Sequence, residues 1–158
     1  MKAGPKSSVA MSASVLMEFD AVIDVRSPAE YADDHIPRAL SCPVLDDAER
    51  AKVGTLYKQV SSFAAKRTGA ALVARNVARH VETAFADRPS TWKPLVYCWR
   101  GGKRSGAMAH VLREIGWGAQ TLEGGYKSYR RYVVEALAEL PPRLRFRVVH
   151  GVTGSGKS

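Results

Sequence analysis

A cysteine-bearing loop between a predicted strand and a predicted helix is the feature that most constrains the fold of this chain. Pro94 precedes the apolar run Leu95–Cys98, which predicts a buried strand, and Gly101-Gly102 then predicts a tight turn. An amphipathic helix is expected next, because apolar residues recur at helical spacing at Met108, Val111, Leu112 and Ile115. A strand that leads through a short turn into a helix is typical of α/β proteins with a parallel sheet.

Strands and helices alternate along the rest of the sequence. Further strands are predicted at Ala21–Val25, Ser41–Leu45, Ala119–Leu122 and Arg145–His150. Helices are predicted from Pro28 to about Asp33, within residues 46–85 and at Tyr126–Leu140. A stripe that must face a core recurs every fourth residue at Val73, Val77, Val81 and Phe85. A chain of 158 residues has the length of one domain, and we expect a three-layer α/β fold with a central parallel sheet and helices on both faces.

Composition and charge exclude several classes of protein. With 46% hydrophobic and 25% charged residues the chain is not disordered throughout, and no run approaches the roughly 18 apolar residues of a membrane helix. Two cysteines are too few for a disulfide framework, which favours a reducing, cytoplasmic setting. Basic side chains outnumber acidic ones by 24 to 15, and residues 98–158 hold 11 basic but only four acidic side chains. This excess suits a polyanionic partner or an anionic substrate as well as a simple basic surface.

The residues after Cys98 predict an anion cradle beside a reactive thiolate. They are Trp99, Arg100, Gly101, Gly102, Lys103, Arg104 and Ser105. The glycines allow successive N–H groups to point inward and the next helix adds its partial positive charge, which together hold a tetrahedral oxyanion. We expect the three cationic side chains of the loop to stabilise the thiolate. Cys98 is therefore the predicted nucleophile, and a buried structural cysteine is the alternative.

Two chemistries fit this spacing. Cysteine, five residues and then arginine, from Cys98 to Arg104, is formally the phosphate loop of cysteine phosphatases, and it also fits carriers that hold sulfur or selenium on the cysteine. A phosphatase needs an acid for the leaving alkoxide. The candidates, none of which stands out, are Asp24, Asp33, Asp34 and Asp46. Four widely spaced histidines and two cysteines predict no metal site.

Three motifs make the chain resemble a rhodanese-like domain. They are DVRSPAEY with HIP (residues 24–31 and 35–37), YCWRGGKRS (97–105) and LEGG (122–125). Residues 43–50 and 53–59 are more narrowly similar to the tRNA 2-selenouridine synthase family, in which a P-loop domain follows the rhodanese domain. The closing GVTGSGKS (151–158) has the pattern of such a phosphate loop. The resemblance covers residues 21–158.

The resemblance implies a rhodanese-like fold and a selenium transferase. The family converts 2-thiouridine at the tRNA wobble position to 2-selenouridine with selenophosphate, and it can also geranylate the thiouridine with geranyl diphosphate. Cys98 matches the family's essential cysteine and is the expected selenium acceptor. The implied partner is tRNA, the co-substrates are selenophosphate and geranyl diphosphate, and no cofactor is bound. A general rhodanese sulfurtransferase, a cysteine phosphatase and a non-catalytic tRNA-binding remnant are the alternatives.

Several positions near the first motif need a separate interpretation. Many relatives carry glycine where this chain has Asp34 and Arg38; aspartate tolerates a left-handed helix end, whereas Arg38 places a charge near a turn. The cysteine loop is one residue longer than the commoner rhodanese pattern, which favours a bulkier or phosphate-like donor. A capping box accounts for Glu30. The residues interpreted as structural rather than catalytic are Asp24, Arg26, Glu30, His35 and Cys42.

The phosphate-loop motif predicts an incomplete site. Gly151, Gly156, Lys157 and Ser158 are the required residue types, but no helix follows them in this sequence to direct N–H groups at a phosphate. We expect this tail to be poorly ordered and to bind neither nucleotide nor geranyl diphosphate. The predicted organisation is a disordered leader at 1–14, a rhodanese-like domain at 15–140, and a linker with a truncated P-loop start at 141–158.

Overall fold

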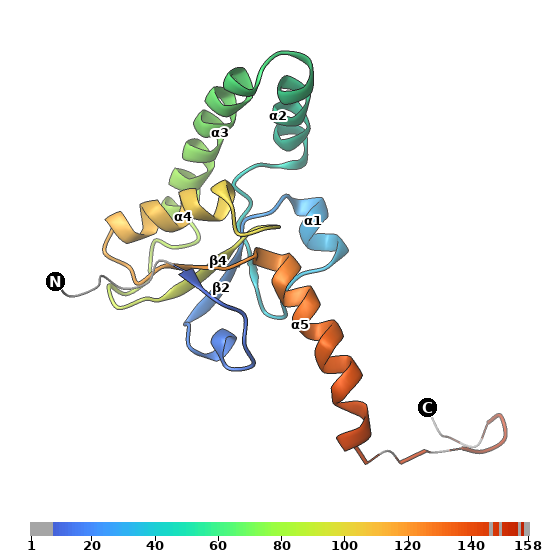
Figure 1. Cartoon of the computed structure of the whole chain (residues 1–158). Coiled ribbons are helices and arrows are strands. Elements are labelled where there is room, and N and C mark those ends of the chain that lie inside the picture. Colours follow the sequence, from blue (N-terminus) through green and yellow to red (C-terminus); the bar gives the residue numbers. More distant parts are fainter. Residues whose placement is uncertain (1–7, 146, 149, 155, 157–158) are drawn as a thin grey trace.

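A five-stranded parallel sheet with the order β1-β5-β4-β2-β3 forms the centre of the computed structural model, which describes residues 8–145, 147–148, 150–154 and 156 (Figure 1). The strands are β1 (Ser8–Val9), β2 (Ala21–Asp24), β3 (Leu40–Ser41), β4 (Pro94–Tyr97) and β5 (Gln120–Leu122). Because β4 pairs with both β2 and β5, the strand before the cysteine loop is the middle one. The predicted α/β class with a central parallel sheet is confirmed.

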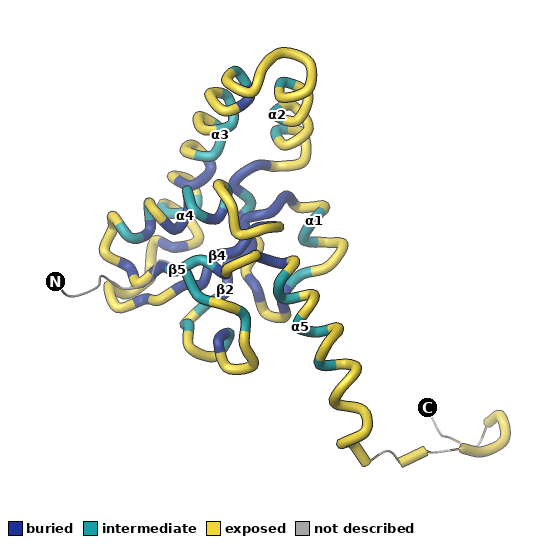
Figure 2. Tube along the Cα trace, viewed as in Figure 1, coloured by how far each residue is buried: buried dark blue, intermediate teal, exposed yellow. Residues whose placement is uncertain are grey.

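Helices connect the strands. They are α1 (Pro28–Asp33), α2 (Asp47–Gln59), α3 (Ser62–Glu82), α4 (Lys103–Glu114) and α5 (Gly125–Glu139), with short 3₁₀ turns η1 (Val15–Met17) and η2 (Pro141–Arg143). The hairpin of α2 and α3 stands away from the sheet, and α5 begins at the sheet and extends outward (Figure 1). The far halves of both projections are largely exposed, whereas β2 and β4 at the centre of the sheet are largely buried (Figure 2).

Two apolar cores lie on opposite faces of the sheet. Val96 and Cys98 enter the first core together with residues of α3 and α4, whereas Leu95 and Tyr97 enter the second with Tyr126 of α5. This alternation follows from the two-residue period of a strand. The predicted stripe between residues 73 and 85 packs in the first core. Helices therefore cover both faces, as the sequence predicts.

Capping boxes start α1 and α2, two of the three helices that precede the site in the chain. In α1 the backbone N–H of Ser27 donates to Glu30 Oε2 at 3.1 Å, as predicted. In α2 the N–H of Glu49 donates to Asp46 Oδ1 at 2.7 Å, and the N–H of Asp46 donates back to Glu49 Oε2 at 3.0 Å. The second box was not singled out in the sequence, although it has the same pattern of an acceptor followed by glutamate three residues later.

The leader and one strand differ from prediction. Residues 8–14 are not a disordered leader, because Ser8–Val9 pairs with β5 and Val9 O accepts a hydrogen bond from Glu123 N at 2.8 Å. Residues 1–7 lie outside the described part of the chain. The strand predicted at Ser41–Leu45 is shorter and starts earlier, at Leu40–Ser41, because the chain then turns and buries Val44 and Leu45 in the interior.

Two predictions near helix and chain ends are also corrected. Ile115 is 47% exposed, because α4 ends at Glu114 and the chain turns at Gly116, so the apolar stripe stops at Leu112. The strand predicted at Arg145–His150 is absent from the described residues of that segment, which pair with no described strand.

Candidate active site

Cys98 lies where β4 ends, next to the first turn of α4, and is only 3% exposed. The backbone N–H of Gly102 donates to its Sγ at 3.2 Å, and Ser105 Oγ lies 3.2 Å from the same Sγ. Ser105 is fully buried. The structure therefore brings together the predicted nucleophile and two residues of the predicted cradle.

These hydrogen bonds set the acidity of the thiol. Burial acts to raise the pKa of Cys98, but the Ser105 hydroxyl and the backbone N–H groups of Ser105, Gly102 and Arg100 outweigh it, so the pKa lies below the ordinary value. A thiol with a lowered pKa has more thiolate, the nucleophilic form, at neutral pH. Donors on a short loop thus favour the thiolate form of a buried cysteine.

The first turn of α5 holds the start of the cysteine loop through two backbone hydrogen bonds. Tyr126 N donates to Cys98 O at 2.8 Å, and Lys127 N donates to Trp99 O at 3.1 Å. These N–H groups at a helix start have no partner inside their own helix. The loop carbonyl groups accept their hydrogen bonds, and these bonds in turn fix the position of the loop.

Glycine is required at Gly125 for this contact. Its φ is 58°, and a Cβ there would overlap the carbonyl oxygen of Cys98 and approach Gly101 N to 2.6 Å. Gly101 has a φ of 65°, and a Cβ there would lie 2.7 Å from Leu122 O. Sequence reasoning read Gly124-Gly125 only as a turn and missed this role. The sequence signal for this role was the Gly124-Gly125 pair, which follows a predicted strand as Gly101-Gly102 does, and two such turns lie at the same edge of a parallel sheet.

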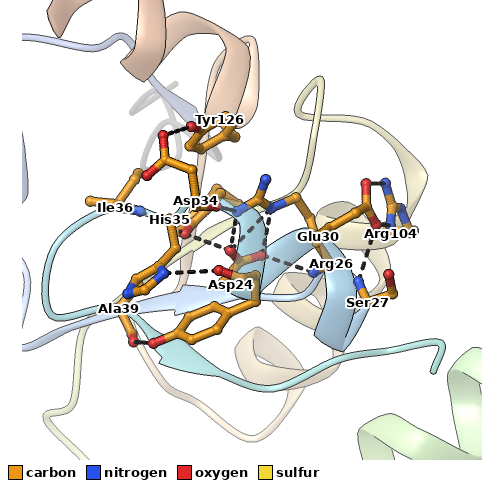
Figure 3. Close-up of polar contacts among 12 residues, drawn as sticks. Asp24, Arg26, Ser27, Glu30, Asp34, His35, Ile36, Ala39, Arg104 and Tyr126 are labelled. Carbon is orange, nitrogen blue, oxygen red and sulfur yellow. Dashed lines mark hydrogen bonds and ion pairs between the residues drawn. The ribbon is translucent and has the colours of Figure 1, made fainter. Parts of the chain in front are cut away.

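Arg104 supports the loop through Glu30 (Figure 3). Its Nη1 lies 2.8 Å from Glu30 Oε2, and Arg50 Nε of α2 lies 3.2 Å from the same oxygen. Burial acts to raise the pKa of Glu30, but the hydrogen bond and charge of Arg104 hold it below the usual range. Glu30 therefore links α1, α2 and α4 as a carboxylate.

The cationic side chains act differently from the prediction. The largest contributions that lower the thiol pKa come from hydrogen-bond donors rather than from the charges of Arg100, Lys103 and Arg104. Arg104 forms an ion pair with Glu30. Arg100 and Lys103 are exposed, so their side chains lie on the rim of the loop. The reason is the geometry of the turn, which points main-chain N–H groups at sulfur and long side chains outward.

Asp24 and Arg26 form a buried ion pair beside Tyr126 (Figure 3). Arg26 Nη2 lies 2.7 Å from Asp24 Oδ2, and both side chains are at most 1% exposed. Tyr97 OH donates to the same oxygen at 2.6 Å, and the guanidinium lies 4.1 Å from the ring centroid of Tyr126. This arrangement fits the scaffold interpretation of Asp24 and Arg26.

Three of the four candidate acids have structural partners, and the fourth, Asp33, is exposed at the end of α1. Asp24 is engaged by Arg26, Asp46 caps α2, and Asp34 accepts a hydrogen bond from Tyr126 OH. Asp34 has a φ of −167°, so its backbone is extended and the tolerance of aspartate for the left-handed conformation is not used there. Arg38, with a φ of 66°, does take the left-handed conformation that glycine would adopt without strain.

An apolar cavity of about 440 Å³ lies between α2, α3 and the first turn of α4. Val53, Tyr57 and Val73 line it, and Lys103 and Arg104 border it on the side of the cysteine loop. The cavity was not predicted, because it depends on how the α2–α3 hairpin leans over α4.

The rest of the predicted site residues lie elsewhere. Gly151 and Gly156 are exposed and distant in sequence from the loop, and Lys157 and Ser158 lie outside the described residues. Within the described ranges, no three histidine, cysteine, aspartate or glutamate side chains are grouped so as to hold a metal. None of the helices described is both long and apolar enough to cross a membrane.

A parallel α/β sheet that presents a cysteine on a backbone-lined loop defines a class of group-transfer domains, and comparison with known proteins gives the family. Residues 10–132 match the family described as Rhodanese-like domain, so the chain belongs to that family. It is 36% identical over 141 residues to a tRNA 2-selenouridine synthase of Nitrosomonas europaea and 37% identical over 145 residues to one of Bdellovibrio bacteriovorus.

Each of these two matches covers 87% of this chain but 36% of the relative, so the chain spans little more than a third of their length. Among solved structures, the N-terminal domain of a Clostridium difficile 630 protein described as ATP/GTP binding matches with a TM-score of 0.67 and 33% identity. That match covers 81% of this chain and 99% of the other. The rhodanese-like architecture therefore recurs as an N-terminal domain.

Proposed function

We propose that this chain is the selenium-transferring part of a tRNA 2-selenouridine synthase. In this reaction the Cys98 thiolate attacks the selenium of selenophosphate, an S–Se bond forms, and the P–Se bond breaks with its electron pair leaving on phosphorus, as phosphite. The terminal selenium on Cys98 then attacks C2 of 2-thiouridine at the wobble position of tRNA. The C2–S bond breaks, and the displaced sulfur takes the place of selenium on Cys98 as a persulfide. The names of the curated relatives support the product, and the resemblance supports the donor.

The observation that carries the proposal is the buried Cys98 Sγ with a lowered pKa, held by Gly102 N–H and Ser105. N–H groups that converge on one sulfur also suit a tetrahedral anion beside it. The excess of basic side chains in residues 98–158 suits tRNA. A cytoplasmic setting belongs to the same proposal, and so does a nucleotide-binding role for the phosphate-loop motif in longer relatives.

Intact-mass analysis after incubation with selenophosphate tests the proposal. We expect one selenium on the wild-type chain and on Cys42→Ala, and none on Cys98→Ser. A selenium-free wild-type protein contradicts the proposal. Efficient loading by thiosulfate without loading by selenophosphate would favour a general sulfurtransferase. Hydrolysis of an aryl phosphate that Cys98→Ser loses would favour a phosphatase, and tRNA binding without any adduct would favour a non-catalytic remnant.

Geranyl transfer, which the resemblance also implies, is supported by the apolar cavity. An apolar chain could occupy the space between α2 and α3 while its anionic end lies near Lys103 and Arg104. Calorimetry with geranyl diphosphate is expected to show binding to the wild type that Ala70→Trp, which fills the cavity, abolishes. Binding that survives in Ala70→Trp but is lost in Lys157→Ala would instead assign the ligand to the phosphate-loop motif.

A further inference from the structure

Trp99 stands apart from the other two tryptophans of the chain. Trp92 and Trp117 are 2% and 8% exposed and pack edge-to-face in the first core, with ring centroids 5.1 Å apart. Trp99 is 37% exposed and directly follows the nucleophile. A large exposed aromatic at the mouth of a reactive loop is not accounted for by core packing.

The indole of Trp99 is held in place from one side. It stacks on Tyr126 with centroids 5.5 Å apart and an angle of 30° between the rings, and Tyr126 is only 1% exposed. Tyr126 in turn lies over the Arg26 guanidinium, and Lys127 N–H fixes the carbonyl of Trp99. The ring is therefore positioned before any ligand arrives, so little side-chain entropy is lost when a flat ligand binds to its exposed surface.

Exposed cations follow Trp99 in the cysteine loop and lie in α5, whose first turn holds that loop. Arg100 and Lys103 lie on the same loop, and Lys127, Arg130 and Arg131 lie in the first two turns of α5. The acidic residues between positions 98 and 131 number two, at Glu114 and Glu123. An aromatic ring flanked by cations is the usual platform for an unpaired nucleobase, because the ring stacks on the base while the cations pair with the phosphates on either side.

We infer that Trp99 is the residue on which the target base of an RNA loop stacks, so that the base is presented at the cysteine loop. The inference rests on the proposed function, because it takes RNA as the substrate, and it adds the residue that reads the flat face of the base. Stacking of this kind contributes about 1–3 kcal/mol per base. Trp99 is thus a substrate-contacting residue, whereas the chalcogen is carried by Cys98.

Tryptophan fluorescence tests the inference without requiring turnover. The probe is an anticodon stem-loop RNA with 2-thiouridine at the wobble position, and the matched ligand is the same stem-loop with an abasic wobble ribose. We expect the thiouridine RNA to quench the exposed Trp99 strongly and the abasic RNA to quench it weakly. Trp99→Phe, which retains only the two buried tryptophans, is expected to show no quenching.

Binding of the same RNA by the variants gives a second measurement. We expect Trp99→Leu to weaken binding about tenfold or more and Trp99→Phe to retain most of the affinity, since phenylalanine also stacks. Equal binding of the thiouridine and abasic RNAs, or Trp99→Leu binding as tightly as the wild type, overturns the inference.

Loading of Cys98 by selenophosphate separates this inference from the proposed function. The wild-type chain is the sample for this measurement, because the contacts of its thiol are with Gly102 and Ser105 and loading needs no RNA. Normal loading of the wild type together with unchanged RNA binding in Trp99→Leu overturns the inference and leaves the proposed function standing. Absence of loading in the wild type overturns the proposed function, whatever the fluorescence shows.

Discussion

The two cysteines have the same burial but opposite acidity. Cys42 and Cys98 are both 3% exposed, both follow a parallel strand and both belong to the first core. Burial raises the pKa of Cys42 to about 11, with Arg88 lowering it and Asp24 raising it to lesser extents. The pKa of Cys98 is lowered, although burial acts on it in the same direction. Burial alone therefore makes a thiol inert, and the loop after the strand decides whether it reacts.

The difference between the two environments lies in the main chain. The backbone N–H of Cys42 donates to Asp24 O at 2.8 Å, next to the pairing of β2 with β3. The residue after Cys42 is a proline, which has no N–H to donate to the sulfur. Cys98 is followed by a curled loop whose N–H groups face its sulfur. Backbone N–H donors therefore favour the thiolate of Cys98, and the first turn of α5 holds the loop that carries them in position.

The largest effect that tests this comparison is the rate of alkylation. At pH 7 we expect iodoacetamide to modify Cys98 at least about 100-fold faster than Cys42 in the native protein, since the two pKa values differ by two or more units in the direction of a more acidic Cys98. Peptide mapping by mass spectrometry measures both rates at once. In denaturing urea the two rates should become similar, and similar rates in the native state would refute the comparison.

Substitution of Gly125 by alanine should destroy the difference between the cysteines. The added Cβ would overlap the Cys98 carbonyl oxygen, and the alanine would have to adopt a positive φ. Together these two effects should lower the free energy of unfolding by about 3 kcal/mol. Urea denaturation measures the loss, and the surviving folded protein should alkylate Cys98 more slowly. Gly54→Ala is the matched control, because its Cβ meets open space in α2 and should stabilise the protein by about 1 kcal/mol.

Sequence reasoning predicted the parts of this site that depend on local pattern. Sequence pattern and turn chemistry predicted the strand–turn–helix order around Cys98, the capping box at Glu30 and the helices on both faces of a parallel sheet, and the structure contains them. Arg38 was identified as a departure from glycine, and it does take the left-handed conformation.

Contacts between distant segments could not be predicted in the same way. Three features depend on how distant segments pack together. They are the contact of Gly125 and Tyr126 with the cysteine loop, the ion pair of Arg104 with Glu30, and the cavity beside α3. For this reason sequence reasoning attributed the stabilisation of the Cys98 thiolate to the cationic side chains, whereas hydrogen bonds make the larger contribution. The strand at residues 8–9 was missed because two residues carry too little periodicity to be seen.

Ser105→Ala should move Cys98 partway toward the behaviour of Cys42. The variant removes the hydroxyl that favours the thiolate but keeps the backbone N–H groups of Gly102, Ser105 and Arg100. Because a hydrogen bond to a charged group contributes about 1.5–3 kcal/mol, we expect alkylation at pH 7 to slow roughly tenfold and its pH profile to shift to higher pH. Ser128→Ala, at a hydroxyl that bonds only α5 and the turn before it, is the control and should leave the rate unchanged.

The smallest expected effect is on stability at alkaline pH, where the two cysteines should act with opposite signs. The pKa of Cys42 is raised to about 11 in the folded state, so above the ordinary thiol value of about 8.5 the unfolded chain loses a proton that the native chain keeps. Cys42 therefore destabilises the protein progressively as pH rises from about 8.5 to about 11, by about 1 kcal/mol at pH 9.5. Cys98, whose pKa is lowered, contributes stability that is fully present above about 8.5 and is lost as pH falls through its folded-state pKa.

Urea unfolding at pH 7.5 and 9.5 of the wild type, Cys42→Ala and Cys98→Ser separates the two contributions. Between these pH values we expect the unfolding free energy of Cys42→Ala to improve by about 1 kcal/mol relative to the wild type, because the variant no longer has a buried thiol that resists ionisation. Relative to the wild type, Cys98→Ser should instead lose stability over the same interval, since it lacks the thiolate that the loop holds. Three parallel curves would mean that the loop does not favour the charged form of sulfur, and the contrast between the two cysteines would then lie in access to the reagent rather than in acidity.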